Sequence, residues 1–190
     1  GTAADTLFVN DTTKPTLKQG QVLVKVHSFG INRADTLQRQ GKYPAPRGES
    51  SILGLEVSGE VVEIAEAEET TASRWQLGDK VFALVAGGGY AQYVAVNASH
   101  LMPKPKNVDM PSAAGIAEVF LTAYQSLFQV GGLKSGQRVL IHAGASAVGL
   151  AAIQLAKADG CHVSVTASSE KKLAECEKYG ADRLINYKTQ

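Results

Sequence analysis

Cysteine, basic clusters and long apolar runs are all scarce in this sequence, and each scarcity excludes a class of protein. Cys161 and Cys176 are too few for a disulfide scaffold and lie in no metal-binding spacing, so we expect reduced thiols and a cytoplasmic location. The net charge is +1 with no basic block, which disfavours nucleic acid and anionic membranes as partners. No apolar run approaches the roughly 20 residues of a membrane-spanning helix, and Gly1–Asp5 lacks the features of a signal peptide.

Several catalytic motifs are also missing. The sequence has no H-E-x-x-H pattern, no C-x-x-C pattern and no G-x-S-x-G nucleophile elbow. It therefore gives no sign of a zinc protease, a dithiol redox enzyme or a serine hydrolase. Internal repeats and low-complexity tracts are absent as well. What distinguishes the sequence is the order of its predicted elements and a few short motifs.

Residues 1–110 are predicted to form a β-rich domain. Apolar and polar residues alternate clearly at Val22, Val24 and Val26, which indicates a strand with one buried face. Gly87–Gly89 separates two later candidates with a flexible connection. Short strands with frequent turn signals predict a partly open barrel or a sandwich. The expected strands span 21–27, 57–64, 80–85 and 91–96.

The pattern changes at Pro111, so residues 111–190 are predicted to form linking helices and then a second domain. Apolar residues follow helical spacing from Ile116 to Val130, and Gly131 and Gly132 then stop the helix. Strands and helices alternate after that, which predicts a parallel sheet with right-handed crossovers, the first half of a doubly wound α/β fold. The strands are expected at 138–142, 162–166 and 183–187, and the helices at 147–158 and 169–179.

A glycine-bearing turn between the strand at 138–142 and the helix at 147–158 predicts a dinucleotide site. Gly144 and Gly149 stand where backbone must approach a pyrophosphate that faces the helix N-terminus, and Ser146 replaces the usual middle glycine. The alternative is a tight strand-to-helix turn that binds nothing. Ser146 is compatible with a hydrogen bond to cofactor or substrate and equally with a structural role.

The end of the second strand favours NADPH over NADH. An acidic side chain there accepts from the ribose 2′-hydroxyl of NADH, whereas small polar and basic residues accommodate a 2′-phosphate. Ser168 and Ser169 occupy this end, and Lys171 and Lys172 follow in the next turn. Glu170 is the one dissenting residue, but an acid in a first helical turn also matches the helix dipole.

Longer motifs resemble one enzyme family. The segment from Asn32 to Pro44, NRADTLQRQGKYP, is similar to the N-R-A-D-x-x-x-R-x-G-x-Y-P signature of quinone oxidoreductases in the medium-chain dehydrogenase/reductase superfamily. ILGLEVSG from Ile52, AEVFLTAY from Ala117 and INY from Ile185 also resemble that family, especially its zeta-crystallin-like and stress-inducible members. The resemblance implies a GroES-like barrel followed by a Rossmann domain, with the active site in the cleft between. It also implies a homodimeric protein of about 320–340 residues, of which these residues form a part.

The resemblance also implies roles for individual residues. Asn32 and Tyr43 would line the cleft near the nicotinamide, with Thr122 nearby, and the proton could come from water, Tyr43 or Ser146. The turn residues Gly144, Ala145, Ser146, Ala147, Val148 and Gly149 would contact the cofactor. Ser168, Lys172 and Tyr187 would hold the 2′-phosphate.

Departures from the zinc alcohol dehydrogenases predict a zinc-independent enzyme with no metal ligands. The catalytic cysteine of those enzymes would fall near Asn32–Asp35, where none is present, and their His-Glu pair reads Leu55-Glu56. Without a Lewis acid, quinones and activated enones are the suitable hydride acceptors. We therefore expect hydride transfer from NADPH to a quinone. An enone or enoyl-thioester reductase on the same fold and a non-catalytic, crystallin-like NADPH-binding protein are the alternatives. Glu56 itself is expected to be a structural acid near the domain hinge.

Overall fold

The computed structural model describes residues 7–65 and 74–189, and the chain divides into two compact units, Gly1–Glu118 and Val119–Gln190. The expected boundary at residue 110 lies inside the first unit. Helix α3 (Met110–Ala113) packs against strands of the first unit, and the Met110 carbonyl oxygen accepts a hydrogen bond from Ser58 Oγ at 2.5 Å. Ala113 and Ala117 pack with Phe82 in a small apolar cluster. The residues that follow the five strands therefore pack against those strands before the second unit begins.

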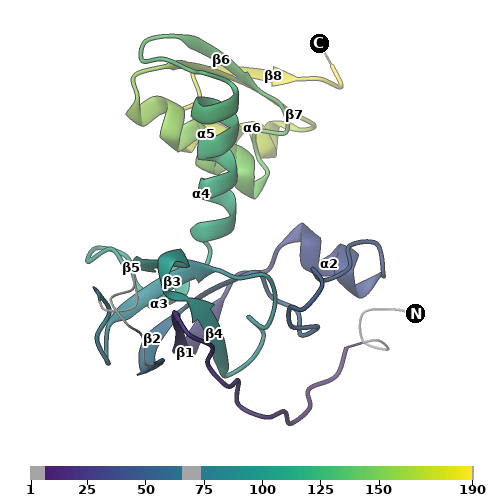
Figure 1. The fold of residues 1–190 in the computed structure, drawn as a ribbon. Helices are drawn as coiled ribbons and strands as arrows, with labels where there is room; N and C mark the ends of the chain where they lie inside the picture. The colour runs from purple at the N-terminus through teal and green to yellow at the C-terminus, as the bar shows by residue number, and fades with distance from the viewer. Residues whose placement is uncertain (1–6, 66–73, 190) are drawn as a thin grey trace. The chain divides into compact units, whose positions relative to one another are not determined.

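The first unit is built on a five-stranded antiparallel sheet in the order β4-β1-β2-β3-β5 (Figure 1). The expected strands are confirmed, and the described strands form an open sheet and not a closed barrel. The short β5 was not expected, because three residues are too few to show an alternation. Valines from the strands supply most of the apolar core of the five-stranded sheet. The strands are β1 (Gln21–Phe29), β2 (Glu56–Ile64), β3 (Lys80–Leu84), β4 (Tyr93–Asn97) and β5 (Leu101–Pro103).

Helix α2 (Arg33–Arg39) was not expected from the sequence, because its seven residues show little apolar periodicity. Its start is fixed by Asp35, whose Oδ2 accepts a hydrogen bond from the Asn32 backbone N–H at 2.7 Å. This half of a capping box satisfies a backbone donor at the helix N-terminus. The NRAD motif is therefore a helix start.

The expected helix after Pro111 is interrupted. Helix α3 ends at Ala113, and helix α4 (Ala117–Tyr124) begins after Gly115, a poor helix former. Helix α4 then continues as a π-helical segment, Gln125–Val130, which ends at Gly131 as the sequence predicted. The Gly131 N–H donates to the Ser126 carbonyl oxygen at 2.9 Å, the wider spacing of a π turn.

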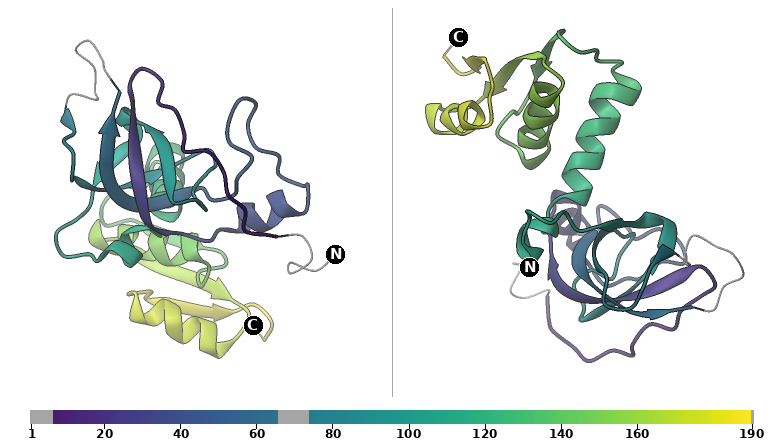
Figure 2. Two further views of the ribbon diagram at one scale, coloured as in Figure 1. Left: turned by 90° about the horizontal axis from the view of Figure 1, so that it is seen from below. Right: turned by 90° about the vertical axis from the view of Figure 1, so that its left-hand side faces the viewer.

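The second unit contains a parallel three-stranded sheet in the order β6-β7-β8, as predicted. Helices α5 and α6 lie on the same side of this sheet (Figures 1 and 2). The core between them includes Val163, Val165, Ile153 and the free thiols of Cys161 and Cys176. The elements are β6 (Arg138–Ile141), α5 (Ala147–Ala158), β7 (His162–Ala167), α6 (Glu170–Lys178) and β8 (Arg183–Asn186).

The other side of the parallel sheet is less covered. Leu140 on β6 pairs with Ser164 on β7, and the Leu140 side chain is 50% exposed. Among the described strands, β6 pairs with β7 alone and forms one edge of the sheet. Of the helices that the structure describes, none combines the length and apolar character needed to cross a membrane.

Candidate functional site

The predicted glycine turn joins the carboxyl end of β6 to the N-terminus of α5. Ser146 is the N-cap of α5, and its Oγ accepts a hydrogen bond from the Gly149 N–H at 3.0 Å. The turn is also held to the next strand, because the Gly144 N–H donates to the Thr166 carbonyl oxygen at 3.0 Å. The first backbone N–H groups of a long helix are thereby placed beside the ends of two parallel strands, where an anion is favoured.

Both glycines of the turn are required by close packing. A Cβ atom at Gly149 would lie 2.5 Å from the Gly144 carbonyl oxygen and 2.6 Å from that of Ala143. A Cβ atom at Gly144 would lie 2.8 Å from Cβ of Val165. Contacts this short exclude any larger side chain without backbone movement. The two glycines are therefore required by packing within the chain, and their predicted approach to a pyrophosphate stays a prediction.

Ala143 begins the turn in a strained conformation. Its φ of +53° makes it the one non-glycine residue with positive φ among those described. An L-residue in this left-handed region costs roughly 1–2 kcal/mol. Such strain often accompanies functional sites, and no sequence signal indicated it, since alanine is unremarkable in a turn.

A pocket of about 190 Å³ lies beside this turn. Predicted cofactor residues from three segments of the chain meet there. The glycine turn and the strand end predicted the first two segments, and the resemblance predicted Tyr187. Lys172 Nζ is 3.2 Å from Ser168 Oγ and donates to it. Of the described residues that line the pocket, none is acidic. The lining residues are Ala143, Ala145, Ser146, Ala167, Ser168, Lys172 and Tyr187.

The remaining predicted cofactor residues lie elsewhere in the second unit. Gly144 and Gly149 are buried beneath the turn, and Ala147 and Val148 form the first turn of α5. Thr122 is exposed on α4 and is not among the pocket-lining residues. The nicotinamide-side role assigned to Thr122 stays a prediction.

The side chains that line the pocket are chemically suited to an anionic group such as a phosphate. Lys172, Ser168 and Tyr187 offer one cation and two hydroxyls to it. A lysine and hydroxyl donors are suited to a phosphate monoester. The residues present are thus compatible with NADPH.

Glu170, the acidic residue that argued against NADPH, forms a hydrogen bond that the sequence did not predict. Its Oε1 accepts a hydrogen bond from Asn186 Nδ2 at 2.8 Å. Asn186 is only 7% exposed and ends strand β8. Its separation from Glu170 along the chain leaves no local signal for the pairing.

In the first unit, Asn32 belongs to a network of buried carboxylates. Asn32 Nδ2 donates to Glu56 Oε1 at 2.8 Å, and the Glu118 backbone N–H donates to Glu56 Oε2 at 2.9 Å. Asp35 accepts from the Tyr90 hydroxyl at 2.9 Å. Glu56 and Asp35 are 2% and 3% exposed. The sequence analysis expected Glu56 to be a structural acid, which stays a prediction, and it missed the hydrogen bond between Asp35 and Tyr90.

Burial shifts the pKa values of three groups in and beside this network upward. Burial raises the pKa of Glu56 above its usual value, against the opposing effect of hydrogen bonds from Glu118 and Asn32. Burial, followed by the charges of Glu56 and Asp35, raises the pKa of Glu118. Burial and the bond to Asp35 raise the pKa of Tyr90. Close packing maintains the arrangement, because a Cβ atom at Gly30 would lie 2.2 Å from Glu56 Oε1.

Tyr43, the other predicted catalytic residue of this unit, stands apart from the network. It follows α2 in a loop and is 48% exposed. Among residues 7–65 and 74–189, no hydrogen-bond partner of its hydroxyl is found, which leaves that group available to a ligand. Its catalytic role stays a prediction.

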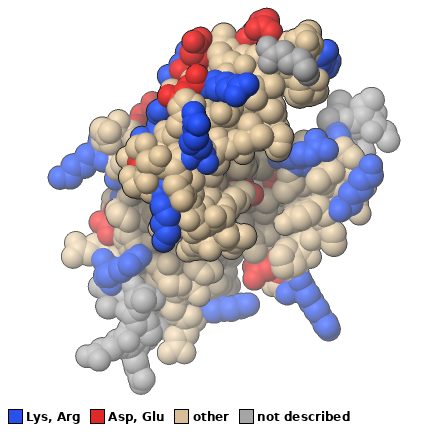
Figure 3. Space-filling view, turned by 90° about the horizontal axis from the view of Figure 1, so that it is seen from above, with Lys and Arg blue, Asp and Glu red and all other residues tan. Residues whose placement is uncertain are grey.

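Within the described part of the chain, no group of three or more His, Cys, Asp or Glu side chains could hold a metal ion. On the face shown in Figure 3, Lys and Arg side chains stand singly or in small groups among uncharged residues.

Two family models match the chain. One is described as the alcohol dehydrogenase GroES-like domain and matches residues 18–106. The other is described as zinc-binding dehydrogenase and matches residues 147–190. The first model spans strands β1 to β5, and the second spans α5 to β8 but does not include β6.

Individual proteins are similar over most of the chain. The human quinone oxidoreductase is 34% identical over 181 residues, which cover 94% of this chain and 54% of that protein. A lovastatin diketide synthase of Aspergillus terreus is 37% identical over 163 residues, 85% of this chain and 6% of the synthase. The quinone oxidoreductase of Thermus thermophilus, whose structure includes an NADPH complex, has a TM-score of 0.78 and 35% identity and covers 94% of this chain and 55% of its own. The chain thus spans about half the length of the quinone oxidoreductases that it matches.

Ala143→Gly is expected to stabilise the fold. Glycine relieves the cost of a positive φ, roughly 1–2 kcal/mol, but loses about 0.5–1 kcal/mol through its freer unfolded chain, so we expect a net gain of about 0.5–1 kcal/mol. Urea unfolding measures the difference. Ala174→Gly, at an exposed position inside α6, is the matched control and should instead lose about 1 kcal/mol. Equal losses in both variants would contradict the strain at Ala143.

Glu118→Gln is expected to raise the melting temperature at pH 7 but not at pH 4. Folding raises the pKa of Glu118 above its ordinary value of 4.5. The stability associated with its protonation is therefore fully present below pH 4.5 and is lost as the pH rises through the folded pKa. Glutamine is neutral throughout and avoids that loss. Calorimetric melts at both pH values test this, with Glu177→Gln on exposed α6 as the control. An equal gain at pH 4 would show that charge is not the cause.

Proposed function

Since the chain belongs to the medium-chain dehydrogenase/reductase superfamily, among its quinone oxidoreductases, we propose that it binds NADPH and transfers a hydride to a quinone without zinc. The observation that carries this proposal is the pocket beside the glycine turn, whose described lining includes Lys172, Ser168 and Tyr187 and no acidic residue. NADPH differs from NADH by the phosphate that such a set of side chains would bind. Because the chain spans about half of its relatives, the activity is proposed for the whole protein.

The cofactor side of the mechanism rests on the second unit. Backbone N–H groups at the start of α5 would bind the pyrophosphate, and Gly144 and Gly149 would let the backbone approach it. Lys172, with Ser168 and Tyr187, would bind the 2′-phosphate. Bound NADPH would supply a hydride from its nicotinamide ring. The protein's contribution is to fix the position of that ring relative to the acceptor.

The acceptor side rests on the first unit. Asn32 Nδ2 donates to Glu56 Oε1 at 2.8 Å, and this bond fixes the orientation of the Asn32 amide. A bound acceptor would therefore contact an amide whose orientation is already set. The hydroxyl of Tyr43 is available to donate a proton to the reduced acceptor. Ser146 remains a second candidate, because its Oγ accepts from Gly149 while its own proton stays free to be donated. Water is the third.

A second function is favoured by one comparison. The lovastatin diketide synthase that is similar over 85% of this chain has a name that indicates polyketide assembly, so an enone or enoyl-thioester acceptor is the alternative to a quinone. Both acceptors take hydride readily without a Lewis acid. A non-catalytic NADPH-binding role is the third possibility. A cytoplasmic, homodimeric protein stays a prediction.

Lys172→Glu is expected to weaken NADPH binding by roughly 10–100-fold, the value of one hydrogen bond to a charged group. NADH binding should change little, because NADH lacks the phosphate. Fluorescence titration with both cofactors measures this. Lys178→Glu is the matched control, since Lys178 lies on the same helix but pairs with Glu175. Equal NADPH affinity in wild type and Lys172→Glu would reject the assigned pocket.

Oxidation of NADPH by the longest available form of the protein, with a naphthoquinone as acceptor, is expected to proceed unchanged in the presence of a zinc chelator. The reason is that the acceptor needs no Lewis acid. Loss of turnover on chelation would contradict zinc independence. Turnover with an enoyl thioester but not with the quinone would favour the alternative acceptor, and tight NADPH binding without any turnover would favour the non-catalytic role.

A further inference from the structure

Glu170 presents a conflict at the proposed phosphate pocket. It is the first residue of α6, two positions after Ser168 and two before Lys172, and both of those residues line the pocket. An acidic side chain at the end of the second strand accepts from a ribose 2′-hydroxyl and repels a 2′-phosphate. A carboxylate so close in sequence to Lys172 would therefore be expected to oppose NADPH unless something keeps it away.

Asn186 is the hydrogen-bond partner of this carboxylate. Its Nδ2 donates to Glu170 Oε1 at 2.8 Å, and its own Oδ1 accepts from the Lys188 backbone N–H at 3.2 Å. The amide is thus fixed from both ends. Asn186 is buried, and its backbone is in register with Ala167 at the end of β7, immediately before Ser168.

The lining of the pocket is consistent with a carboxylate that is bound by Asn186 and does not enter the pocket. The residues described as lining it include Lys172 and Ser168 but not Glu170. Lys172 Nζ donates to Ser168 Oγ, and no ion pair joins Lys172 to Glu170 among the described residues. The ammonium group of Lys172 is therefore not neutralised by Glu170 and stays available to bind an anion.

We propose that Asn186 is a specificity-determining residue, which restrains the Glu170 carboxylate so that Lys172 and Ser168 can bind the phosphate monoester of NADPH. The inference rests on the proposed function. In the absence of the Asn186 amide, Glu170 is free to turn toward the pocket, where it accepts from a ribose hydroxyl and repels a phosphate. The restraint acts on cofactor choice, and Asn186 itself does not contact the cofactor.

A double-mutant cycle with a binding readout tests this inference. NADPH and NADH are titrated calorimetrically into the wild type, Asn186→Ala, Glu170→Gln and the double variant. Asn186→Ala is expected to weaken NADPH binding by about fivefold, the size of one screened charge contact, and to leave NADH binding equal or tighter. In the Glu170→Gln background the same substitution should change NADPH affinity less than about twofold, because the released side chain carries no charge.

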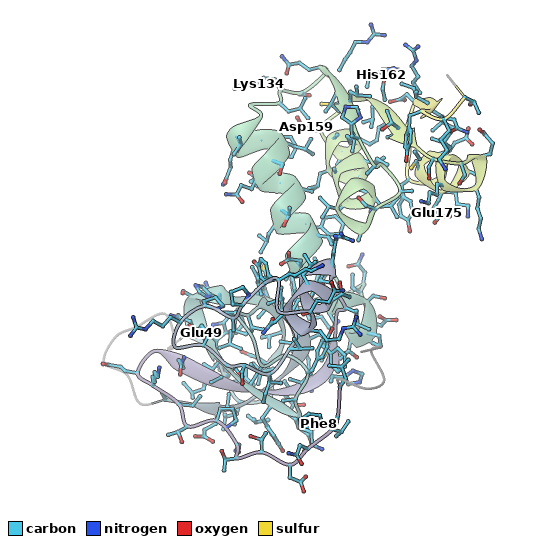
Figure 4. The ribbon with its side chains drawn as sticks, turned by 90° about the vertical axis from the view of Figure 1, so that its right-hand side faces the viewer. Phe8, Glu49, Lys134, Asp159, His162 and Glu175 are labelled. Carbon is cyan, nitrogen blue, oxygen red and sulfur yellow. The ribbon has the colours of Figure 1, made fainter. Side chains whose placement is uncertain are left out.

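The matched control replaces another acid of the same helix. Glu175 lies on α6 (Figure 4) and pairs with Lys178 Nζ at 2.8 Å. In a Glu175→Gln background, Asn186→Ala should keep its full effect on NADPH. Glu170→Asp provides a variant that leaves the buried asparagine intact. Its shorter carboxylate no longer reaches the amide, so it should weaken NADPH binding while Glu170→Gln does not.

The outcomes separate this inference from the proposed function. Equal losses of NADPH and NADH affinity on Asn186→Ala, with or without Glu170, would show that the asparagine is only structural and would overturn the inference. So would unchanged NADPH binding in both Asn186→Ala and Glu170→Asp. A wild-type protein that binds NADPH no more tightly than NADH would instead reject the NADPH assignment of the proposed function, and the inference with it.

Discussion

The candidate site depends on the approach of helix α5 to the turn that precedes it. Gly149 lies so close to the carbonyl oxygens of Ala143 and Gly144 that no Cβ atom fits between them. This contact fixes where the helix begins, and Ser146 then caps it through Oγ. The same contact accompanies the positive φ of Ala143, since the chain must reverse sharply between the strand and the helix. The position of the pocket beside the turn follows from this local geometry, and the rest of the second unit holds its walls in place.

The two units use buried polar groups in different ways. In the first, Glu56 accepts from both Asn32 and the Glu118 backbone, and Asp35 accepts from Asn32 and Tyr90. Removing the Asn32 side chain would take away the donor to the buried Glu56 Oε1, and an unpaired buried acceptor costs more than the bond itself is worth. In the second unit, the Asn186 amide fixes a single carboxylate near an exposed pocket. The carboxylates of the first unit maintain the structure around Asn32, a predicted catalytic residue. The Asn186 amide of the second unit controls where the charge of Glu170 lies.

Sequence reasoning was most successful where the signal is local. The bounds of α5, the parallel order of β6, β7 and β8 and the glycine turn all followed from periodicity and from Gly144 and Gly149. Helix α2 and strand β5 did not, because seven and three residues are too short for a pattern to emerge. The partnership of Glu170 with Asn186 is a tertiary contact across 16 positions, and the strain at Ala143 arises from packing. Neither leaves a trace in composition or spacing, so the charge conflict at Glu170 could be noticed from the sequence but not resolved.

The edge of the parallel sheet has a practical consequence. In the described chain, β6 pairs with β7 alone, and Leu140 on the sheet is half-exposed. An uncovered strand edge with unpaired backbone groups and an apolar neighbour is a template for association with another chain. A preparation limited to these 190 residues would therefore be expected to self-associate as its concentration rises. Ligand titrations on such a sample would combine cofactor binding with strand pairing unless the protein is kept dilute or the edge is covered.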